Sequence, residues 1–380
     1  MNSGVVKTRS GSIPIIRPTL PDIQDVVDTV REAYDSGVVT LGKMVGLFEE
    51  QVRQYTDVDH AVAVSSCTSG LMLAFAAMGF PERAEVVVPS FTFPATVQAL
   101  IWNRLTPVFV DCLPGTMTID PDEVAKAIGP NTAAILPVTT FGLPPDMDTL
   151  GKIAERTGIL LICDSAQGLG ATYRGKRVGG FGLCEAFSLS PTKVITAIEG
   201  GIVTTNDTEL AEKLRAMRDY GKDPDGEEMK FNGLSARMSE LHASVGLLSL
   251  RDADSLIDAR LQLIRKYRER TQNLPGCRVQ EFPEDRISSG NYFTLLIGKN
   301  ARADRDGVMN ELNARNIGSK RYFYPPVHVQ RAFRDHPHRI IGKLPNTWAG
   351  ATTSLALPLY AHMTVQDHDR VCEAIQSILA

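Results

Sequence analysis

The sequence predicts an α/β fold, in which helices cover a mainly parallel mixed β-sheet and a smaller C-terminal α+β domain follows. Short apolar segments recur over roughly the first two thirds of the chain, and helical patterns separate several of them. Most of these segments are continuously apolar, as expected for strands buried on both faces of a parallel sheet. The length of 380 residues exceeds what one hydrophobic core usually serves, so we expect two domains.

The first part of the chain alternates between helical and strand patterns. The spacing of apolar residues predicts two N-terminal helices, over Asp22–Tyr34 and Met44–Tyr55. The predicted strands that follow are Ala61–Val64, Glu85–Val88, Pro107–Val110, Ala133–Val138, Ile159–Cys163, Ala186–Leu189 and Ile202–Thr205. Between them, Asp122–Ile128 and Asp146–Arg156 have helical patterns.

The pattern changes after about Met238. The predicted elements are then one long helix over Leu241–Gln272, a strand at Tyr292–Ile297, and helices at Asp304–Arg315 and Val365–Leu379. We therefore assign a large domain to residues 1–240, and a connecting helix with a small domain to residues 241–380. The polar segment 223–230 is a candidate mobile loop.

Composition and charge exclude several kinds of partner. With 40 basic and 44 acidic residues the net charge is -4 and no basic run is present, so we expect no nucleic acid partner. The longest apolar segments have the length of strands, so we expect no membrane span. Residues 1–16 lack the charged and apolar blocks of a signal peptide, and we therefore expect a cytoplasmic protein.

The cysteines follow neither a disulfide nor a zinc pattern. They are scattered along the chain at positions 67, 112, 163, 184, 277 and 372. Several lie in or beside predicted strands, so we expect reduced and mostly buried thiols, with no metal site.

Two segments place polar groups directly after predicted strands. Ser65–Leu71 (SSCTSGL) follows AVAV and precedes a helical segment. Free amides and the helix dipole favour an anion at such a helix start, although an ordinary Ser/Thr cap fits the same pattern. Asp164 follows the buried segment LLIC, at the edge where open α/β sheets bind ligands. A turn or helix cap is the alternative for this carboxylate.

Two further segments supply a lysine and an aromatic side chain. Lys193, in FSLSPTK, follows a strand and a hydroxyl cluster and has apolar neighbours. Partial burial lowers the pKa of a lysine and makes it a usable nucleophile, whereas most lysines are solvated at the surface. The segment VPSFTFPAT (88–96), after another strand, offers an aromatic ring that could stack on a planar ligand or belong to the core.

Together the four features describe one cofactor, pyridoxal 5′-phosphate. A lysine forms a Schiff base with it, an acid keeps its pyridine nitrogen protonated, and a helix start binds its phosphate. A nicotinamide dehydrogenase is not expected, because no G-x-G-x-x-G follows the first strand. A serine hydrolase would need G-x-S-x-G at a strand-to-helix turn, which SSCTSG does not supply.

A series of short motifs also occurs in one order along nearly the whole chain. They are GVVTLG (37–42), SSCTSGL (65–71), VPSFTFPAT (88–96), PVFVD (107–111), FGLPPDMD (141–148), CDSAQGLGA (163–171), FSLSPTK (187–193), EGG (199–201), RMSE (237–240) and LALP (355–358). In this order they resemble the sugar-nucleotide aminotransferases of the DegT/DnrJ/EryC1/StrS group. The resemblance implies the fold-type-I architecture of pyridoxal phosphate transferases, which is that of aspartate aminotransferase.

The resemblance implies catalytic roles for two residues and ring contacts for two more. Lys193 would bind the cofactor as a Schiff base and then shuttle protons. Asp164 would pair with the pyridine nitrogen. Gln167 would lie against the phenolic oxygen of the ring, and Phe93 would cover the ring face.

The resemblance also implies a phosphate site and a substrate side. The amides of Cys67 and Thr68, with the hydroxyl of Ser188, would bind the phosphate. Thr40 and His328 are the candidate substrate residues, and an ordinary surface histidine is the alternative for His328.

Three residues depart from the family pattern. Cys67 replaces the glycine of the usual Ser-Gly-Thr phosphate motif, which keeps the backbone donors but narrows the loop. Thr139 stands where many members have histidine. Ser235 replaces an asparagine that usually crosses from the second subunit to the phosphate, and its side chain is shorter. Lys193 argues against the related dehydratase subgroup, which has histidine at that position.

The resemblance therefore implies a pyridoxal phosphate-dependent aminotransferase that is a homodimer with shared active sites. We expect amino transfer from an amino acid, glutamate, to a keto group of a nucleotide-linked deoxysugar, and FSLSPTK resembles enzymes for 4-keto-6-deoxyhexoses. One alternative is amination of a cyclitol or another carbocyclic ketone. Another is a regulator that keeps the fold without turnover, but it would be expected to lose Lys193 or Asp164, and both are present.

Overall fold

The computed structural model describes residues 11–223 and 225–380. Residues 1–10, which bear on the predicted lack of a signal peptide, lie outside the described residues, as does residue 224 in the predicted mobile loop. Within the described ranges no helix is both long and apolar enough to cross a lipid bilayer. All six cysteines are free thiols and all but Cys277 are buried, as the sequence predicts.

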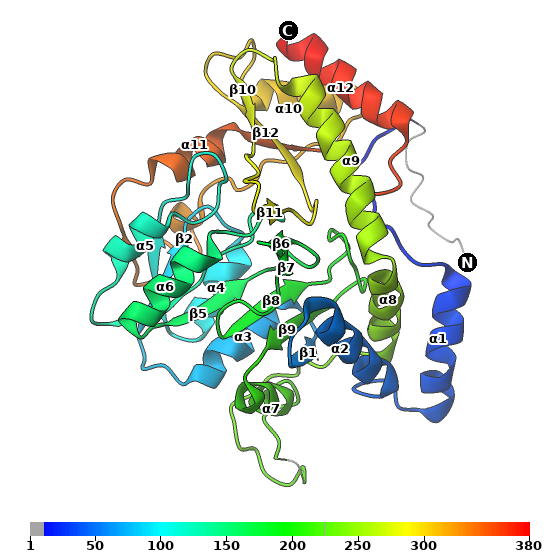
Figure 1. Cartoon of the computed structure of the whole chain (residues 1–380), viewed down its shortest axis with the longest axis vertical. Helices are drawn as coiled ribbons and strands as arrows, with labels where there is room; N and C mark the ends of the chain where they lie inside the picture. Colours follow the sequence, from blue (N-terminus) through cyan, green and yellow to red (C-terminus); the bar gives the residue numbers. More distant parts are fainter. Residues whose placement is uncertain (1–10, 224) are drawn as a thin grey trace.

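An eight-stranded sheet forms the centre of the molecule (Figure 1). In spatial order its strands are β1 (His60–Val64), β9 (Gly201–Thr205), β8 (Cys184–Ser188), β5 (Leu160–Asp164), β4 (Thr132–Ile135), β2 (Glu85–Pro89), β3 (Thr106–Val110) and β13 (Arg339–Ile340). Strand β9 runs antiparallel to both neighbours, and the other neighbouring pairs are parallel. The mainly parallel mixed sheet is thus confirmed, and the predicted strands lie within a few residues of the observed ones.

Helices cover both faces of this sheet, which explains why its strands are continuously apolar. One face carries α3 (Cys67–Met78), α4 (Pro94–Trp102) and α7 (Thr208–Met217), and the other carries α2 (Lys43–Thr56), α5 (Pro121–Ala127), α6 (Met147–Thr157) and α8 (Glu240–Arg251). In β1, Val62 and Val64 belong to the first of these cores, whereas Ala61 and Ala63 belong to the second. Because successive side chains point to opposite faces, a strand between two helical layers has no solvent-exposed face and is mostly apolar.

The C-terminal third forms a smaller group of elements with its own core. They are α9 (Ala253–Thr271), α10 (Arg305–Ala314), α12 (Val365–Leu379) and an antiparallel sheet of β10 (Cys277–Val279), β12 (Phe293–Ile297) and β14 (Ser354–Leu357). Ile13 packs into this core from the N-terminal segment, while β13 joins the central sheet. Segments on each side of residue 240 therefore cross the expected domain boundary. The division into domains 1–240 and 241–380 stays a prediction.

The remaining elements are short or peripheral. They are α1 (Ile23–Ser36), α11 (Pro345–Thr353), a 3₁₀ turn at Val327–Val329, and a small sheet of β6 (Thr172–Tyr173), β7 (Lys176–Arg177) and β11 (Arg286–Ile287).

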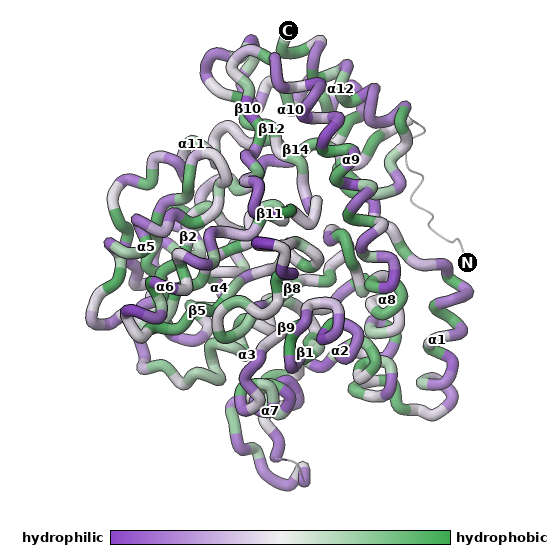
Figure 2. The backbone as a smooth tube through the Cα atoms, viewed as in Figure 1, coloured by the Kyte–Doolittle hydropathy of each residue, from purple (hydrophilic) through white to green (hydrophobic). Residues whose placement is uncertain are grey.

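The single long helix predicted over 241–272 is wrong, because the chain breaks it at Asp252 into α8 and α9. Neither glycine nor proline marks the break. Helix α8 packs against α1 and α2 beside the central sheet, whereas α9 contacts α12 and β10 in the smaller group. The two helices therefore pack on different cores. Figure 2 shows many hydrophilic residues along α9.

Candidate active site

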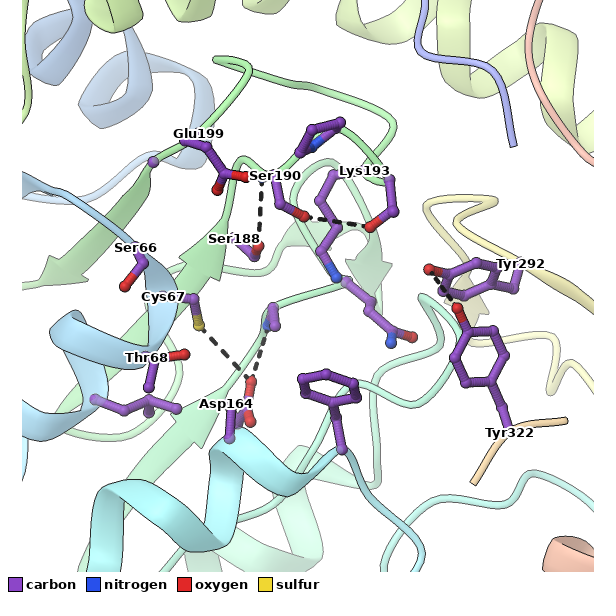
Figure 3. A pocket seen from close by; sticks show the side chains of 18 of the residues that line it. Ser66, Cys67, Thr68, Asp164, Ser188, Ser190, Lys193, Glu199, Tyr292 and Tyr322 are labelled. Atoms are coloured by element: carbon purple, nitrogen blue, oxygen red, sulfur yellow. Dashed lines mark hydrogen bonds between the residues drawn. The ribbon is translucent and has the colours of Figure 1, made fainter. Parts of the chain in front are cut away.

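One pocket lies at the carboxyl edge of the central sheet (Figure 3). Strands β1, β2, β5 and β8 run in the same direction, so the residues that follow them meet at one edge. The cavity has a volume of about 400 Å³. All of the predicted cofactor residues line it: Cys67, Thr68, Phe93, Asp164, Gln167, Ser188 and Lys193.

The start of α3 forms one part of the pocket. Ser66 caps the helix, since its hydroxyl accepts from the Ser69 amide at 3.0 Å and the Ser69 hydroxyl accepts from the Ser66 amide at 3.0 Å. The amides of Cys67 and Thr68 have no acceptor within the described part of the chain. The cap interpretation of SSCTSGL is therefore confirmed. The cap uses the third amide and leaves two amides free, and anion binding by them stays a prediction.

Gly201 lets this helix start come close to the sheet. A Cβ atom at Gly201 would lie 2.4 Å from the Cys67 nitrogen and 2.3 Å from the carbonyl carbon of Ser66. Only glycine fits between β9 and the helix start at this position. Close packing therefore explains the second glycine of EGG, Gly201.

Asp164, at the end of β5, is only 3% exposed. Its Oδ2 accepts from the Thr96 hydroxyl at 2.6 Å, and its Oδ1 accepts from the Ala166 amide at 3.1 Å. Burial raises the pKa of this carboxyl, while the two hydrogen bonds and nearby Lys193 oppose the shift. The Cys67 thiol lies 4.0 Å from Oδ1. A cation that approached from the pocket would favour the charged carboxylate.

Lys193 lies in the segment after β8 and faces the pocket (Figure 3). The buried side chains of Val194 and Ile195 hold this segment in place, and the Lys193 amide donates to the Ser190 carbonyl at 3.0 Å. Lys193 takes part in no ion pair among the described residues. Gln167 has its Oε1 atom buried without a hydrogen-bond partner in the described structure. The pocket therefore holds an available amine and an unsatisfied amide.

Sequence reasoning missed the residues on the opposite wall, which come from the C-terminal third. Tyr292, Lys320 and Tyr322 line the pocket there, and we call them the C-terminal side. The Tyr322 hydroxyl donates to that of Tyr292 at 3.2 Å, and burial raises the pKa of Tyr322. Lys320 lies 4.9 Å from the centre of the Tyr322 ring and is held by backbone pairing with Ala356. No strand-end motif precedes these residues, so the sequence carried no signal for them.

Phe93 borders the mouth of the pocket, and its side chain is 53% exposed. Its ring lies 6.5 Å from that of Phe323 in an edge-to-face arrangement. Because so much of its surface is free, Phe93 is not the core residue that the sequence left as an alternative. It can cover a planar group in the pocket.

The two candidate substrate residues do not line the pocket. The Thr40 hydroxyl donates to the Met238 carbonyl at 3.0 Å. His328 is 7% exposed, and its Nδ1 lies 2.5 Å from the hydroxyl of Ser90. The surface alternative for His328 is therefore wrong, and substrate roles for both residues stay predictions. Burial lowers the pKa of His328.

Two of the departures from the family pattern also lie away from the cavity. Thr139 is buried and lies 3.2 Å, between hydroxyl oxygens, from Ser165. Ser235 is exposed and its backbone pairs with Asp219. Neither residue lines the pocket within the described chain.

Comparison with known proteins identifies the family. The model of the DegT/DnrJ/EryC1/StrS aminotransferase family matches residues 22–376. The chain belongs to this family. The motif order predicts an aminotransferase and the fold-type-I architecture, and both predictions are confirmed.

Members with assigned activities are similar over almost the full length. The chain is 35% identical to GDP-perosamine synthase of Caulobacter vibrioides over 93% of this chain and 95% of that protein. It is 35% identical to dTDP-3-amino-3,4,6-trideoxy-alpha-D-glucose transaminase of Streptomyces venezuelae, covering 91% and 90% of the two chains.

Solved structures of the family agree with this fold. DesI, determined in the presence of its TDP-sugar product, has a TM-score of 0.89 and 35% identity, and covers 97% of this chain and 93% of DesI. PseC of Helicobacter pylori, an aminotransferase involved in the biosynthesis of pseudoaminic acid, has a TM-score of 0.90 and 26% identity, with coverage of 97% and 99%.

Proposed function

We propose that this aminotransferase uses pyridoxal 5′-phosphate to move an amino group from an amino acid, glutamate in our proposal, to a keto group of a nucleotide-linked deoxysugar. A 4-keto-6-deoxyhexose is the proposed acceptor. The observation that carries the proposal is the single pocket in which Lys193, Asp164 and the free amides of α3 meet. The activities named for the Caulobacter and Streptomyces relatives support the substrate class.

The residues present fit this cofactor. The unpaired amides of Cys67 and Thr68 at a helix start suit a phosphate. The buried Oε1 atom of Gln167, which lacks a hydrogen-bond partner in the described structure, needs a polar partner inside the pocket. Burial raises the pKa of the Asp164 carboxyl, and a cation beside it would favour its charged form; a protonated pyridine nitrogen is such a cation.

When bound, pyridoxal phosphate supplies an electron sink for the carbon that carries the amino group. Lys193 would hold the cofactor through Nζ, and during turnover Nζ would take up and return a proton at the substrate carbon. Asp164 would hold the pyridine nitrogen in its protonated form. The amides of Cys67 and Thr68, with the Ser188 hydroxyl, would keep the phosphate in place.

Lys320 supports an anionic substrate. It lines the C-terminal side of the pocket and takes part in no ion pair within the described residues. A diphosphate and an amino-acid carboxylate are both anions that a lysine binds. We propose that Lys320 binds the diphosphate of the acceptor, since a lysine at the mouth can reach beyond the reacting sugar.

We also propose a homodimer, in which each pocket lies near the interface. Apolar side chains are exposed on α1 and on the segment that follows it: Ile23, Tyr34, Val38 and Val39. Tyr34, for example, is 78% exposed. A second copy of the chain would cover such a surface. Sedimentation equilibrium of the active enzyme should give twice the mass of the chain, and an active monomer would contradict the dimer.

The cofactor assignment is tested by chemical trapping. Purified protein is saturated with pyridoxal phosphate, reduced with borohydride and digested, and the peptides are analysed by mass spectrometry. We expect one modified peptide, with the label on Lys193. A protein that takes up no cofactor, or a label on another lysine, would contradict the proposal.

The acceptor is tested by spectral titration. Protein loaded with pyridoxamine phosphate is mixed in turn with keto-sugar nucleotides and with a carbocyclic ketone. The compound that restores the absorption of the pyridoxal form is the acceptor. Restoration only by the carbocyclic ketone would replace the sugar assignment and leave the cofactor assignment intact.

A further inference from the structure

A chain of buried polar groups lies directly behind the pocket. Glu185, the second residue of β8, is 1% exposed and does not line the cavity. Its Oε2 accepts from the Ser165 hydroxyl at 2.5 Å. Its Oε1 accepts from the amides of Gly179 and Phe181, at 2.6 and 2.9 Å. Every partner of this carboxylate is a hydrogen-bond donor, which is the arrangement that stabilises a buried charge.

The chain continues to Thr139 and has one direction. The Ser165 hydroxyl has a single proton, which it donates to Glu185. The Thr139 hydroxyl, 3.2 Å away, must therefore donate to Ser165. The order is Thr139 to Ser165 to Glu185, and we call these three residues the polar chain. Burial raises the pKa of Glu185, and the hydrogen bonds from Ser165, Phe181 and Gly179 oppose this.

The middle residue of the polar chain, Ser165, lies on the segment that carries two pocket residues. Ser165 follows Asp164 directly and precedes Gln167 by two positions. The Ser165 carbonyl accepts from the Gly168 amide at 2.8 Å, which closes the turn that contains Gln167. The Thr139 amide donates to the Asp164 carbonyl at 3.0 Å.

Thr139 also packs against this turn. A Cβ atom at Gly168 would lie 2.9 to 3.2 Å from side-chain atoms of Thr139. Thr139 therefore contacts both ends of the turn, through the backbone at one end and through packing at the other.

We propose that Glu185 is a positioning residue, which acts through Ser165 and Thr139 to hold Asp164 and Gln167 in the geometry that binds the cofactor. A buried carboxylate costs free energy, and an apolar side chain would serve the packing of a central strand better. A fully hydrogen-bonded buried charge can, however, hold a neighbouring segment in one arrangement, and a functional segment needs such an arrangement. The inference rests on the proposed function, since it assumes that Asp164 and Gln167 contact pyridoxal phosphate.

The test compares cofactor affinity and stability in matched variants. Ser165→Ala and Thr139→Val each break the polar chain, whereas Thr139→Ser keeps the hydroxyl. Thr205→Val is the control, because it removes a buried hydroxyl that donates to the Leu183 carbonyl at 2.6 Å, away from residues 164–168. Pyridoxal phosphate is titrated into each apoprotein by fluorescence quenching, and thermal unfolding of the apoprotein is measured in parallel.

We expect Ser165→Ala to raise the dissociation constant of pyridoxal phosphate about 10-fold, because a buried carboxylate loses a hydrogen bond at the segment it orients. Thr139→Val should raise it by a smaller factor and Thr139→Ser should restore it. Thr205→Val should lower the unfolding temperature and leave the dissociation constant unchanged. Unchanged affinity in Ser165→Ala, or an equal loss in Thr205→Val, would overturn the inference.

Glu185→Gln is tested last, alone and together with Ser165→Ala. If Glu185 acts through Ser165, the double variant binds pyridoxal phosphate as weakly as Ser165→Ala alone. Additive losses would overturn that part of the inference. If Glu185→Gln does not fold, Ser165→Ala and Thr139→Val still decide the question. Wild-type protein that binds pyridoxal phosphate at Lys193 keeps the proposed function intact in every case.

Discussion

The two sides of the pocket are built in different ways. On one side, Asp164 and Ser188 end strands of the central sheet, and Lys193 follows one of them, so a scaffold with cores on both faces holds them. We call this the strand-end side. On the C-terminal side, Lys320 and Tyr322 lie after α10 and outside the central sheet.

The difference suggests a division of labour. In the proposed function, the groups that would meet one cofactor with fixed geometry lie on the strand-end side, which the sheet holds rigidly. In the same proposal, the groups that would face the substrate lie on the C-terminal side, where the chain can change without disturbing the sheet. Substitutions on the first side should therefore change turnover, and those on the second should change the apparent affinity for substrate.

The largest effect is expected for Lys193→Ala, on the strand-end side. Loss of a group that in our proposal both holds the cofactor and moves a proton should lower kcat by about 10³-fold or more. Lys343→Ala, at an exposed lysine away from the pocket, is the control and should retain full rate. Steady-state kinetics of folded variants, checked by circular dichroism, measure this. Full activity in Lys193→Ala would remove the basis for the comparison.

A smaller loss is expected for Asp164→Asn, because a neutral amide cannot hold a protonated pyridine nitrogen. We expect kcat to fall about 100-fold, which is typical for loss of one electrostatic contact at a reacting centre. Steady-state assays at saturating cofactor measure it, with Asp258→Asn, at an exposed position of α9, as the control. An unchanged rate would mean that the carboxyl has only a structural role.

The same variant should make the apoprotein more stable at neutral pH. Burial raises the pKa of Asp164, so the folded apoprotein binds this proton more tightly than the unfolded chain does. The resulting stability is present below the unfolded pKa of about 4 and is lost as pH rises through the folded value. Asparagine does not ionise, so Asp164→Asn does not lose this stability as pH rises. The unfolding temperature of the variant apoprotein should therefore exceed that of wild type at pH 7, and the difference should shrink on acidification.

On the C-terminal side, Lys320→Met should raise KM for the sugar nucleotide about 10-fold with kcat nearly unchanged, since a lost ionic contact with the bound substrate affects binding more than chemistry. KM for the amino donor should not change. If the donor KM rises and the acceptor KM does not, Lys320 binds the amino-acid carboxylate. If kcat falls as in Asp164→Asn, the division between the two sides is wrong.

The smallest effect on catalysis is expected for His328→Gln, because His328 is buried beside Ser90 and does not line the pocket. We expect kcat and KM to stay within about two-fold of wild type. Burial lowers the pKa of His328, so the wild-type fold loses stability as pH falls below about 6.5, and the variant should lose less. A large rise in KM would instead support the predicted substrate role.

The sequence predicted the strand-end side closely and the C-terminal side hardly at all. Asp164 and Lys193 follow apolar segments whose pattern marks them as buried strands, and parallel strands bring their carboxyl ends together. The candidate cofactor residues could therefore be grouped from the sequence. Tyr292 and Tyr322 have no such relation, because they approach the pocket only when β12 and the segment after α10 pack on the central sheet.

The break at Asp252 shows the same limit at the level of the fold. Helical spacing over 241–272 is a local property, and it is present on both sides of the break. The change of direction arises because α8 and α9 pack on different cores. Local patterns carry no information about which distant surface a helix will meet.

Local chemistry was enough to predict the sheet, the free amides of α3, and the acid and lysine of the strand-end side. Short-range hydrogen bonding and hydrophobic periodicity determine these features, and both depend only on residues that are close together in the sequence. The tertiary structure alone revealed the contact of Lys320 with the pocket and the hydrogen bonds from Thr139 through Ser165 to Glu185. Those contacts join residues from separate strands and loops, and their distances depend on how the whole chain packs.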